Sequence, residues 1–240
     1  MTASPTAVLL DLDDTLFDHT HSSLAGLEAL RGQFPAFAKM ESAALAKIHS
    51  DNLEAMHALV LRGEMSVDEA RVARFRAMAN DCGAPSLDPA ELVRVYRAAY
   101  QRARRAVPGA FELLHALKSR ATVGVVTNNV VAEQIEKLAH LGMTDLVDVL
   151  VISEEAGVRK PDAAIFRLAL ERCGAEAGQA VMVGDSWGAD VIGARDAGIR
   201  VVWLNRTERP CPAPSWCAEI QSLLPTESVL ELLLCRRSSR

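Results

Sequence analysis

The sequence lacks the features that would place a protein in a membrane or on nucleic acid. Its 240 residues carry a formal net charge of −5, whereas nucleic-acid-binding domains are usually basic, so we expect no nucleic-acid partner. Its apolar runs are shorter than the roughly 18 residues of a membrane span. The N-terminus also lacks the basic segment of a signal peptide, and we therefore expect no membrane association.

Cysteine is scarce, and its spacing suggests no disulfide framework. The five cysteines are odd in number and scattered, and without a secretory signal this pattern favours reduced thiols and a cytoplasmic location. The closest pair, Cys211 and Cys217, has no second pair or histidine nearby, so it makes a poor zinc site. The glycine patterns of dinucleotide-binding folds, serine hydrolases and P-loop proteins are absent as well.

Short apolar runs alternate with helix-like segments along most of the chain. Each run is brief and almost continuously apolar, which is typical of strands buried on both faces of a parallel sheet. Strand and helix in alternation predict an α/β fold with a Rossmann-like parallel sheet. The predicted strands are residues 7–10, 122–126, 148–152, 180–183 and 200–204.

One long segment interrupts this alternation and contains no convincing strand. Residues 18–106 instead show amphipathic helical stretches separated by turn residues, and Ser66 followed by Glu69 predicts a capping box at the start of one helix. We therefore expect an all-helical cap domain at 18–106, inserted into an α/β core made of residues 1–17 and 107–240.

Carboxylates are concentrated at the end of the first predicted strand. Asp11, Asp13 and Asp14 follow it almost without interruption, and such charges are costly to pack together unless a cation or a function offsets the cost. Ligands of open α/β sheets bind at the carboxyl ends of strands, which is where these residues fall. Taken alone, the segment could equally be a solvated turn that begins a helix.

Polar residues at the other strand ends favour a functional site. The second predicted strand runs into Thr127 and Asn128, the fourth is followed by Asp185 and Asp190, and Lys160 lies in the loop between them. Carboxylate oxygens are suited to magnesium, and a hydroxyl, an amide and an ammonium are suited to phosphate oxygens. The combination predicts a site for Mg²⁺ and a phosphate group.

Four short motifs also occur in a fixed order. They are Asp11-Leu12-Asp13-Asp14-Thr15, Thr127, Lys160-Pro161-Asp162, and Gly184-Asp185 followed by Asp190. This set resembles the four motifs of the haloacid dehalogenase-like superfamily, and the helical insertion is similar in placement to the C1 cap of its phosphatase branch.

The resemblance implies a role for each motif residue. Asp11 would attack phosphorus as the nucleophile and form an aspartyl-phosphate, and Asp13 would protonate the leaving oxygen and later deprotonate water. Thr127, Asn128 and Lys160 would hold the phosphate oxygens.

The same resemblance implies a magnesium site. The ion would be held by the Asp11 carboxylate, the Asp13 backbone carbonyl and Asp185, while Asp190 would orient a water or Asp185. Dehalogenases of the superfamily usually lack an acid at the position of Asp13 and need no metal, so Asp13 favours phosphoryl transfer. Many phosphatases have glycine where Asp14 stands; Asp-Asp-Thr resembles members acting on nucleotides, flavin-related phosphates or acylneuraminate phosphate.

We therefore expect a magnesium-dependent phosphatase acting on small phosphate monoesters such as nucleotide, flavin-related or sugar phosphates. The expected partner is a small phosphorylated metabolite, and the expected assembly is a monomer or homodimer. Two alternatives remain open at this point: a phosphomutase that uses the same intermediate, and a non-catalytic binding module.

Overall fold

A parallel β-sheet forms the centre of the larger unit. The computed structural model describes residues 4–235, with the side chain of residue 61 left aside. Within this part of the chain the sheet has the order β3-β2-β1-β4-β5-β6, and all its pairings are parallel. The strands are β1 (Ala7–Leu10), β2 (Thr122–Thr127), β3 (Val149–Ile152), β4 (Ala180–Gly184), β5 (Arg200–Leu204) and β6 (Ala218–Ile220).

The strand order places β1 where the direction of the chain through the sheet reverses. Successive strands are added on one side of β1 as β2 and β3, and on the other side as β4, β5 and β6. In open α/β sheets the ligand-binding crevice lies at the carboxyl ends of the strands beside such a switch point. The predicted α/β fold with a Rossmann-like parallel sheet is confirmed.

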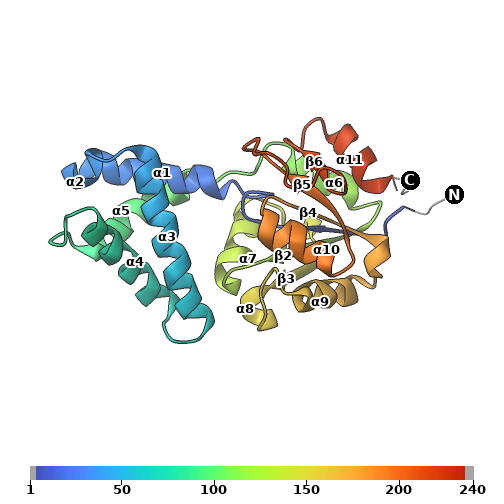
Figure 1. Cartoon of the computed structure of the whole chain (residues 1–240), viewed down its shortest axis with the longest axis horizontal. Helices are drawn as coiled ribbons and strands as arrows, with labels where there is room; N and C mark the ends of the chain where they lie inside the picture. Colours follow the sequence, from blue (N-terminus) through green and yellow to red (C-terminus); the bar gives the residue numbers. More distant parts are fainter. Residues whose placement is uncertain (1–3, 236–240) are drawn as a thin grey trace. The chain divides into compact units, whose positions relative to one another are not determined.

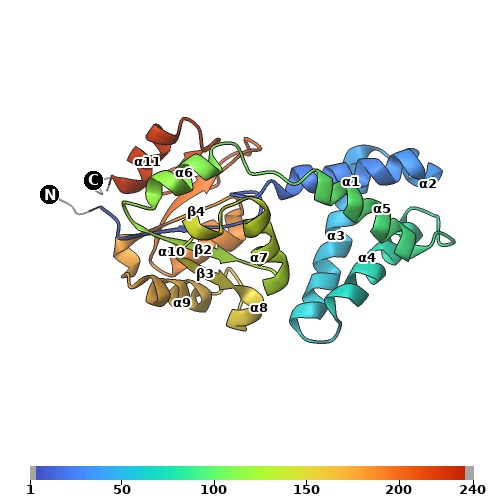
Figure 2. The ribbon, with the colours of Figure 1, turned by 180° about the vertical axis from the view of Figure 1, so that it is seen from behind.

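Helices cover both faces of the sheet (Figures 1 and 2). Right-handed crossovers place α6 (Ala110–Leu117) and α7 (Val131–His140) on one face, and α9 (Ala163–Cys173) and α10 (Gly193–Asp196) on the other. Phe166 of α9 and Val191 pack with Met182 of β4 and other buried side chains on the second face. The remaining short elements are η1 (Thr144–Leu146), α8 (Ser153–Ala156), η2 (Ala177–Gln179), η3 (Trp187–Ile192) and α11 (Thr226–Leu234).

The chain divides into two compact units. One, the core unit, contains residues 1–18 and 105–240, and the other, the helical unit, contains residues 19–104. The helical unit has its own buried cluster, in which Phe37, Phe75 and Leu92 are among the apolar side chains. Its helices are α1 (His19–Gln33), α2 (Pro35–Ala38), α3 (Ser42–Leu61), α4 (Val67–Asp81) and α5 (Pro89–Arg102).

Local sequence signals explain several ends of these helices. The predicted capping box is confirmed: the Ser66 hydroxyl accepts from the backbone N–H of Glu69, and the Glu69 carboxylate accepts from the backbone N–H of Ser66. The Asp88 carboxylate accepts from the N–H of Ala90 at the start of α5. No helix in the described residues is long and apolar enough to cross a membrane.

Some elements lie outside the sequence-based expectation. Strand β6 and helix α11 were not predicted, and the segment after β4 begins as the π-helical turn η3 before continuing as α10. β6 has only three residues, so it offers almost no alternation of apolar and polar residues to detect. The wider π turn follows Asp185 directly, and such turns are frequent at functional sites.

A buried histidine makes the helical unit sensitive to acid. His49 of α3 is 3% exposed, packs against the rings of Tyr96 and Phe75, and its Nε2 has no hydrogen-bond partner among the described residues. Burial lowers the pKa of His49 to about 3, and the charges of Arg74 and His19 add to this effect. The imidazole ring of His49 is therefore neutral in the folded state at neutral pH.

We predict that His49→Leu reduces the loss of stability between pH 7 and pH 5. Because the pKa of His49 is depressed in the fold, stability is present above the ordinary value of 6.5 and is lost as pH falls toward 3. At pH 5 this one group costs about 2 kcal/mol. Thermal unfolding at the two pH values measures the effect, and the exposed His115→Leu is the control. Equal acid sensitivity of both variants and the parent would contradict the prediction.

Candidate active site

The buried ammonium of Lys160 connects three strand ends of the core unit. Its side chain is 3% exposed, and its Nζ donates to Asp11 Oδ1 at 2.5 Å, Asp190 Oδ1 at 2.6 Å and the backbone carbonyl of Val126 at 2.8 Å. These acceptors follow β1, follow β4 and belong to β2. All three ammonium protons are used, which offsets the cost of burying the charge.

The charges around Lys160 are unequal in number. Although burial favours the neutral amine, the carboxylates of Asp11 and Asp190 raise the pKa of Lys160 above its ordinary range, so it stays an ammonium. Burial raises the pKa of Asp11, and the Asp190 and Asp185 carboxylates raise it further against the opposing effect of Lys160. The site therefore holds more negative charge than one lysine neutralises.

Asp190 lies tightly against the end of β4. It is 1% exposed; one carboxylate oxygen accepts from Lys160 and the other accepts from the backbone N–H of Ser186 at 2.9 Å. Gly184 makes this position possible, because a Cβ at residue 184 would lie 2.3 Å from Asp190 Oδ2. Both Asp190 oxygens are thus engaged within the protein.

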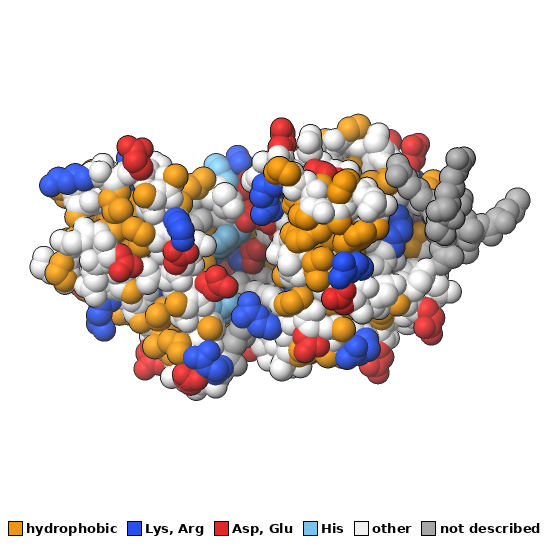
Figure 3. Space-filling model, viewed as in Figure 1, with side chains coloured by type: hydrophobic (Ala, Val, Ile, Leu, Met, Phe, Trp, Pro, Cys, Tyr) orange, Lys and Arg blue, Asp and Glu red, His pale blue; other side chains and the backbone are white. Residues whose placement is uncertain are grey.

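Asp185 is fixed through its backbone. The indole N–H of Trp203 on β5 donates to the Asp185 carbonyl at 2.8 Å, and Trp187 packs edge-on against Trp203. Trp187 also contacts Trp216, which is 42% exposed, and hydrophobic side chains gather over the η3 and α10 region of the core unit (Figure 3). The aromatic cluster therefore holds the backbone from which the Asp185 carboxylate projects.

Three carboxylates of the core unit are arranged as a cation site. Oxygens of Asp11, Asp185 and Asp190 all lie within 4.8 Å of one another. Burial and the nearby carboxylates of Asp190 and Asp14 raise the pKa of Asp185 to about 7. A hard divalent cation takes carboxylate oxygens and would relieve this repulsion, so the residues present fit Mg²⁺.

Asn128 fixes the loop that carries Lys160. Its side-chain Nδ2 donates to the Lys160 carbonyl at 2.9 Å, and its Oδ1 accepts from the Lys160 N–H at 2.8 Å. The amide N–H and C=O of the Asn128 side chain therefore bind the backbone C=O and N–H of Lys160, in the way that paired strands bind each other. Direct binding of phosphate by Asn128 stays a prediction, whereas its contact with the lysine loop is a structural fact.

Asp13 has polar partners that the sequence did not suggest. Lys137 Nζ of α7 lies 2.6 Å and 2.8 Å from the two carboxylate oxygens of Asp13. Gln134 of the same helix donates from Nε2 to Asp13 Oδ2 at 3.1 Å and to Thr127 Oγ1 at 2.5 Å. The only sequence signal was a pair of polar residues three positions apart on an otherwise apolar helix face, which resembles an ordinary solvated position.

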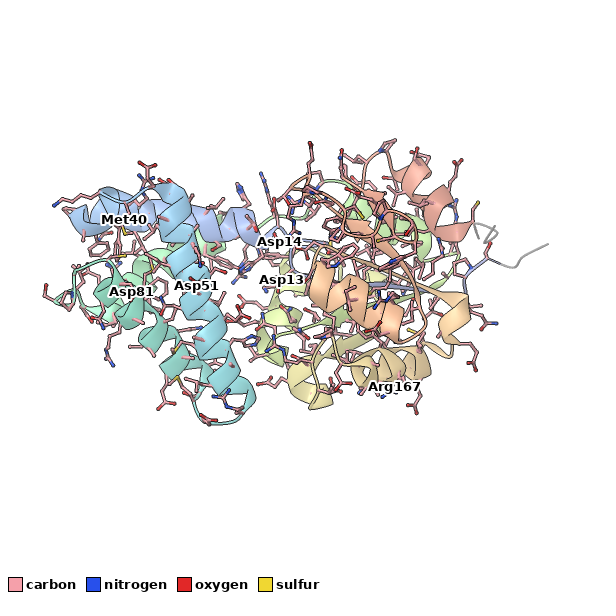
Figure 4. All side chains as sticks on the ribbon, viewed as in Figure 1. Asp13, Asp14, Met40, Asp51, Asp81 and Arg167 are labelled. Carbon is pink, nitrogen blue, oxygen red and sulfur yellow. The ribbon has the colours of Figure 1, made fainter. Side chains whose placement is uncertain are left out.

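Asp13 and Asp14 lie in the loop after β1 (Figure 4), and the backbone turns at Asp14. Asp14 has a φ of 59°, in the left-handed region that aspartate tolerates better than most residues with a side chain. Its N–H donates to the Phe17 carbonyl at 2.7 Å, and Arg206 lies 3.7 Å from its carboxylate. This conformation explains why glycine suits the position, and it directs Asp13 toward α7.

The sequence comparison shows the family of the chain. The profile of the haloacid dehalogenase-like hydrolases matches residues 5–198, which include all four motifs and the helical unit. The chain belongs to this family.

The similar proteins include phosphatases. Pyrimidine 5'-nucleotidase YjjG of Escherichia coli is 37% identical over 63% of this chain and 66% of its own length. Ribulose-1,5-bisphosphate 5-phosphatase of Halopiger xanaduensis is 33% identical over 85% of this chain and 86% of its own. The structure of the HAD-hydrolase YfnB of Bacillus subtilis, determined bound to magnesium, is 25% identical with a TM-score of 0.73, covering 96% and 99% of the two chains.

We predict that Gly184→Ala disrupts the charged cluster of this haloacid dehalogenase-like hydrolase. The added methyl group overlaps the Asp190 carboxylate, so Asp190 must move away from Lys160, at a cost of about 1–3 kcal/mol. Thermal unfolding and a crystal structure of the variant measure the effect. Gly188→Ala is the matched control, because a Cβ there meets nothing within 4 Å. Equal stability of the two variants would contradict the role given to Gly184.

Proposed function

We propose that the protein is a magnesium-dependent phosphatase that hydrolyses small phosphate monoesters through an aspartyl-phosphate on Asp11. The observation that carries the proposal is the Lys160–Asp11 contact at the switch point of the sheet. Lys160 binds Oδ1 of Asp11, and Oδ2 accepts no hydrogen bond from the described residues. That oxygen is the one we assign to attack phosphorus.

The first half-reaction transfers the phosphoryl group to the protein. Asp11 Oδ2 forms a bond to phosphorus while the bond from phosphorus to the leaving oxygen breaks, and Asp13 gives its proton to that oxygen. The Thr127 hydroxyl accepts from Gln134, so its own proton points elsewhere and is suited to a phosphate oxygen. Lys160 balances charge beside Asp11 as the negative phosphoryl group approaches.

The second half-reaction releases phosphate. The Asp13 carboxylate takes a proton from water, the water oxygen forms a bond to phosphorus, and the bond between phosphorus and Asp11 breaks. Asp13 is then protonated and Asp11 is free, as at the start. Mg²⁺, held by the carboxylates of Asp11 and Asp185 and the backbone carbonyl of Asp13, would neutralise phosphate charge. Asp190 would help to orient these metal-binding groups, because it binds the Lys160 ammonium and the backbone N–H of Ser186.

Small phosphate esters are the proposed substrates. The two phosphatase relatives act, by their names, on a pyrimidine nucleotide and on a sugar bisphosphate, which share a phosphate monoester on a small polar molecule. The helical unit resembles the C1 cap in its placement and helical character, and we propose that it selects the leaving group. We propose a small phosphorylated metabolite, with no nucleic acid, as the partner of a monomer or homodimer.

We predict that Asp11→Asn lowers hydrolysis of p-nitrophenyl phosphate by roughly 10³-fold or more, because an amide is a poor nucleophile. Release of p-nitrophenol at saturating magnesium measures turnover, and thermal unfolding checks the fold. Asp145→Asn makes the same change at an exposed position of the core unit and serves as the control. Turnover within a few-fold of the parent would exclude Asp11 as the nucleophile.

We predict that EDTA removes this activity, that Mg²⁺ restores it, and that Asp185→Asn prevents the restoration. Folding raises the pKa of Asp185 from 3.8 to about 7. The folded protein therefore loses stability as pH rises from 3.8 to 7, because the buried carboxyl group is forced to ionise. At pH 8 without metal, Asp185→Asn should therefore stabilise the protein, by about 1–3 kcal/mol.

A thermal-unfolding series with and without Mg²⁺ at pH 8 measures both effects. The parent protein should gain stability with Mg²⁺, and Asp185→Asn should gain little, since a ligand stabilises only the state that binds it. Activity that survives chelation, or an unchanged magnesium response in the variant, would exclude this metal site.

A further inference from the structure

Helix α7 of the core unit carries two polar side chains on its buried face. Gln134 is fully buried and Lys137 is 4% exposed, and they lie three residues apart beside the buried Leu138. Burying an ammonium and an amide in this position costs desolvation, and a buried ion pair rarely exceeds the stability of apolar side chains of the same volume. Stability alone therefore gives little reason for these residue types.

The two side chains determine the orientation of Asp13. Lys137 Nζ binds both carboxylate oxygens, at 2.6 Å and 2.8 Å, and also lies 5.2 Å from the centre of the Phe17 ring. Gln134 adds a third hydrogen bond, to Oδ2. Three hydrogen bonds from these two side chains fix the plane of the Asp13 carboxylate, which is 25% exposed. Oδ1 accepts one of these bonds, and Oδ2 accepts two.

Gln134 also connects Asp13 with Thr127. The two protons of its Nε2 are directed to Asp13 Oδ2 and to Thr127 Oγ1. One amide group thus sets the separation between the carboxylate that follows β1 and the hydroxyl that ends β2. Gln134 would thereby fix the distance between a phosphate group bound by Thr127 and the proton carried by Asp13. Efficient proton transfer requires such a fixed distance.

We infer that Gln134 and Lys137 are positioning residues for the acid–base carboxylate Asp13, an inference that rests on the phosphatase chemistry proposed above. Both act through the Asp13 carboxylate, and neither is assigned a contact with the substrate. They hold Asp13 so that its proton moves to the leaving oxygen as the bond from phosphorus to that oxygen breaks, and so that it accepts a proton from water in the second half-reaction. Lys137 thus does for Asp13 what Lys160 does for Asp11.

A double-mutant cycle tests this inference. The turnover of p-nitrophenyl phosphate is measured at fixed Mg²⁺ for the parent, Lys137→Met, Asp13→Asn and the double variant. If Lys137 acts through Asp13, Lys137→Met should lower kcat by roughly 10-fold or more, change KM less than about 3-fold, and cause no further loss in the Asp13→Asn background. Independent, multiplicative losses, or an effect confined to KM, would overturn it.

Three further variants separate positioning from stability. Lys137→Arg keeps the charge and the donors and should recover most of kcat. If Lys137 had only a structural role, kcat of the variants would instead fall in step with their unfolding temperatures. Gln134→Leu should also lower kcat, and it provides a second test if Lys137→Met fails to fold. Lys118→Met removes a surface ion pair with Asp148 in the same unit and should leave kcat unchanged.

The leaving group gives a second readout. When the phosphoryl group of a nucleotide or sugar phosphate is transferred, the nucleoside or sugar leaves as an alkoxide, which needs the proton from Asp13 more than p-nitrophenolate does. Lys137→Met should therefore reduce kcat for the best such substrate more than for p-nitrophenyl phosphate. Equal losses for both substrates would count against positioning. If Asp11→Asn stays active, the proposed function fails; if Asp11→Asn is inactive and the cycle is additive, only the role of Gln134 and Lys137 fails.

Discussion

The buried ammonium of Lys160 is the interaction on which the candidate site depends. It has almost no access to water, so its charge is tolerable only because Asp11, Asp190 and a carbonyl of β2 accept its protons. The two carboxylates are equally dependent on the ammonium. Removing Lys160 would leave these buried carboxylates without a counter-charge, and this dependence fixes loops that come from distant parts of the sequence.

The same cluster retains an excess of negative charge that packing has to support. The pKa of Asp11 and the pKa of Asp185 are both raised, because their carboxylates are buried beside Asp190 and share one lysine. Such an arrangement costs stability, and the parallel sheet and the tryptophans behind Asp185 hold it together. Carboxylates with shifted pKa values are typical of catalytic sites. In such sites the protein is less stable than it could be, because charged groups are held in place to bind a cation and a phosphate.

Two lysines bind different carboxylates of the first motif. Lys160, from the loop before α9, binds Asp11, while Lys137, from α7, binds Asp13. Asn128 orients the backbone of the first lysine loop, and Gln134 joins Asp13 to Thr127. Asp11 and Asp13 are therefore oriented from different sides of the sheet, so the two can have different chemical roles although they are two residues apart.

The sequence by itself determined the parallel sheet, the helical insertion and the capping box of α4, because these follow from local periodicity and from turn residues. It also indicated which strand ends carry polar groups, since the motifs lie directly after apolar runs. The three-residue β6, helix α11 and the π turn after Asp185 lay beyond such signals. Only the tertiary structure decided that Lys137 pairs with Asp13, that Asn128 binds the Lys160 backbone, and that His49 is buried. The first of these contacts joins residues that are distant in the sequence, since Lys137 and Asp13 are 124 positions apart. Strand order and helix packing set such contacts, and no local pattern encodes them.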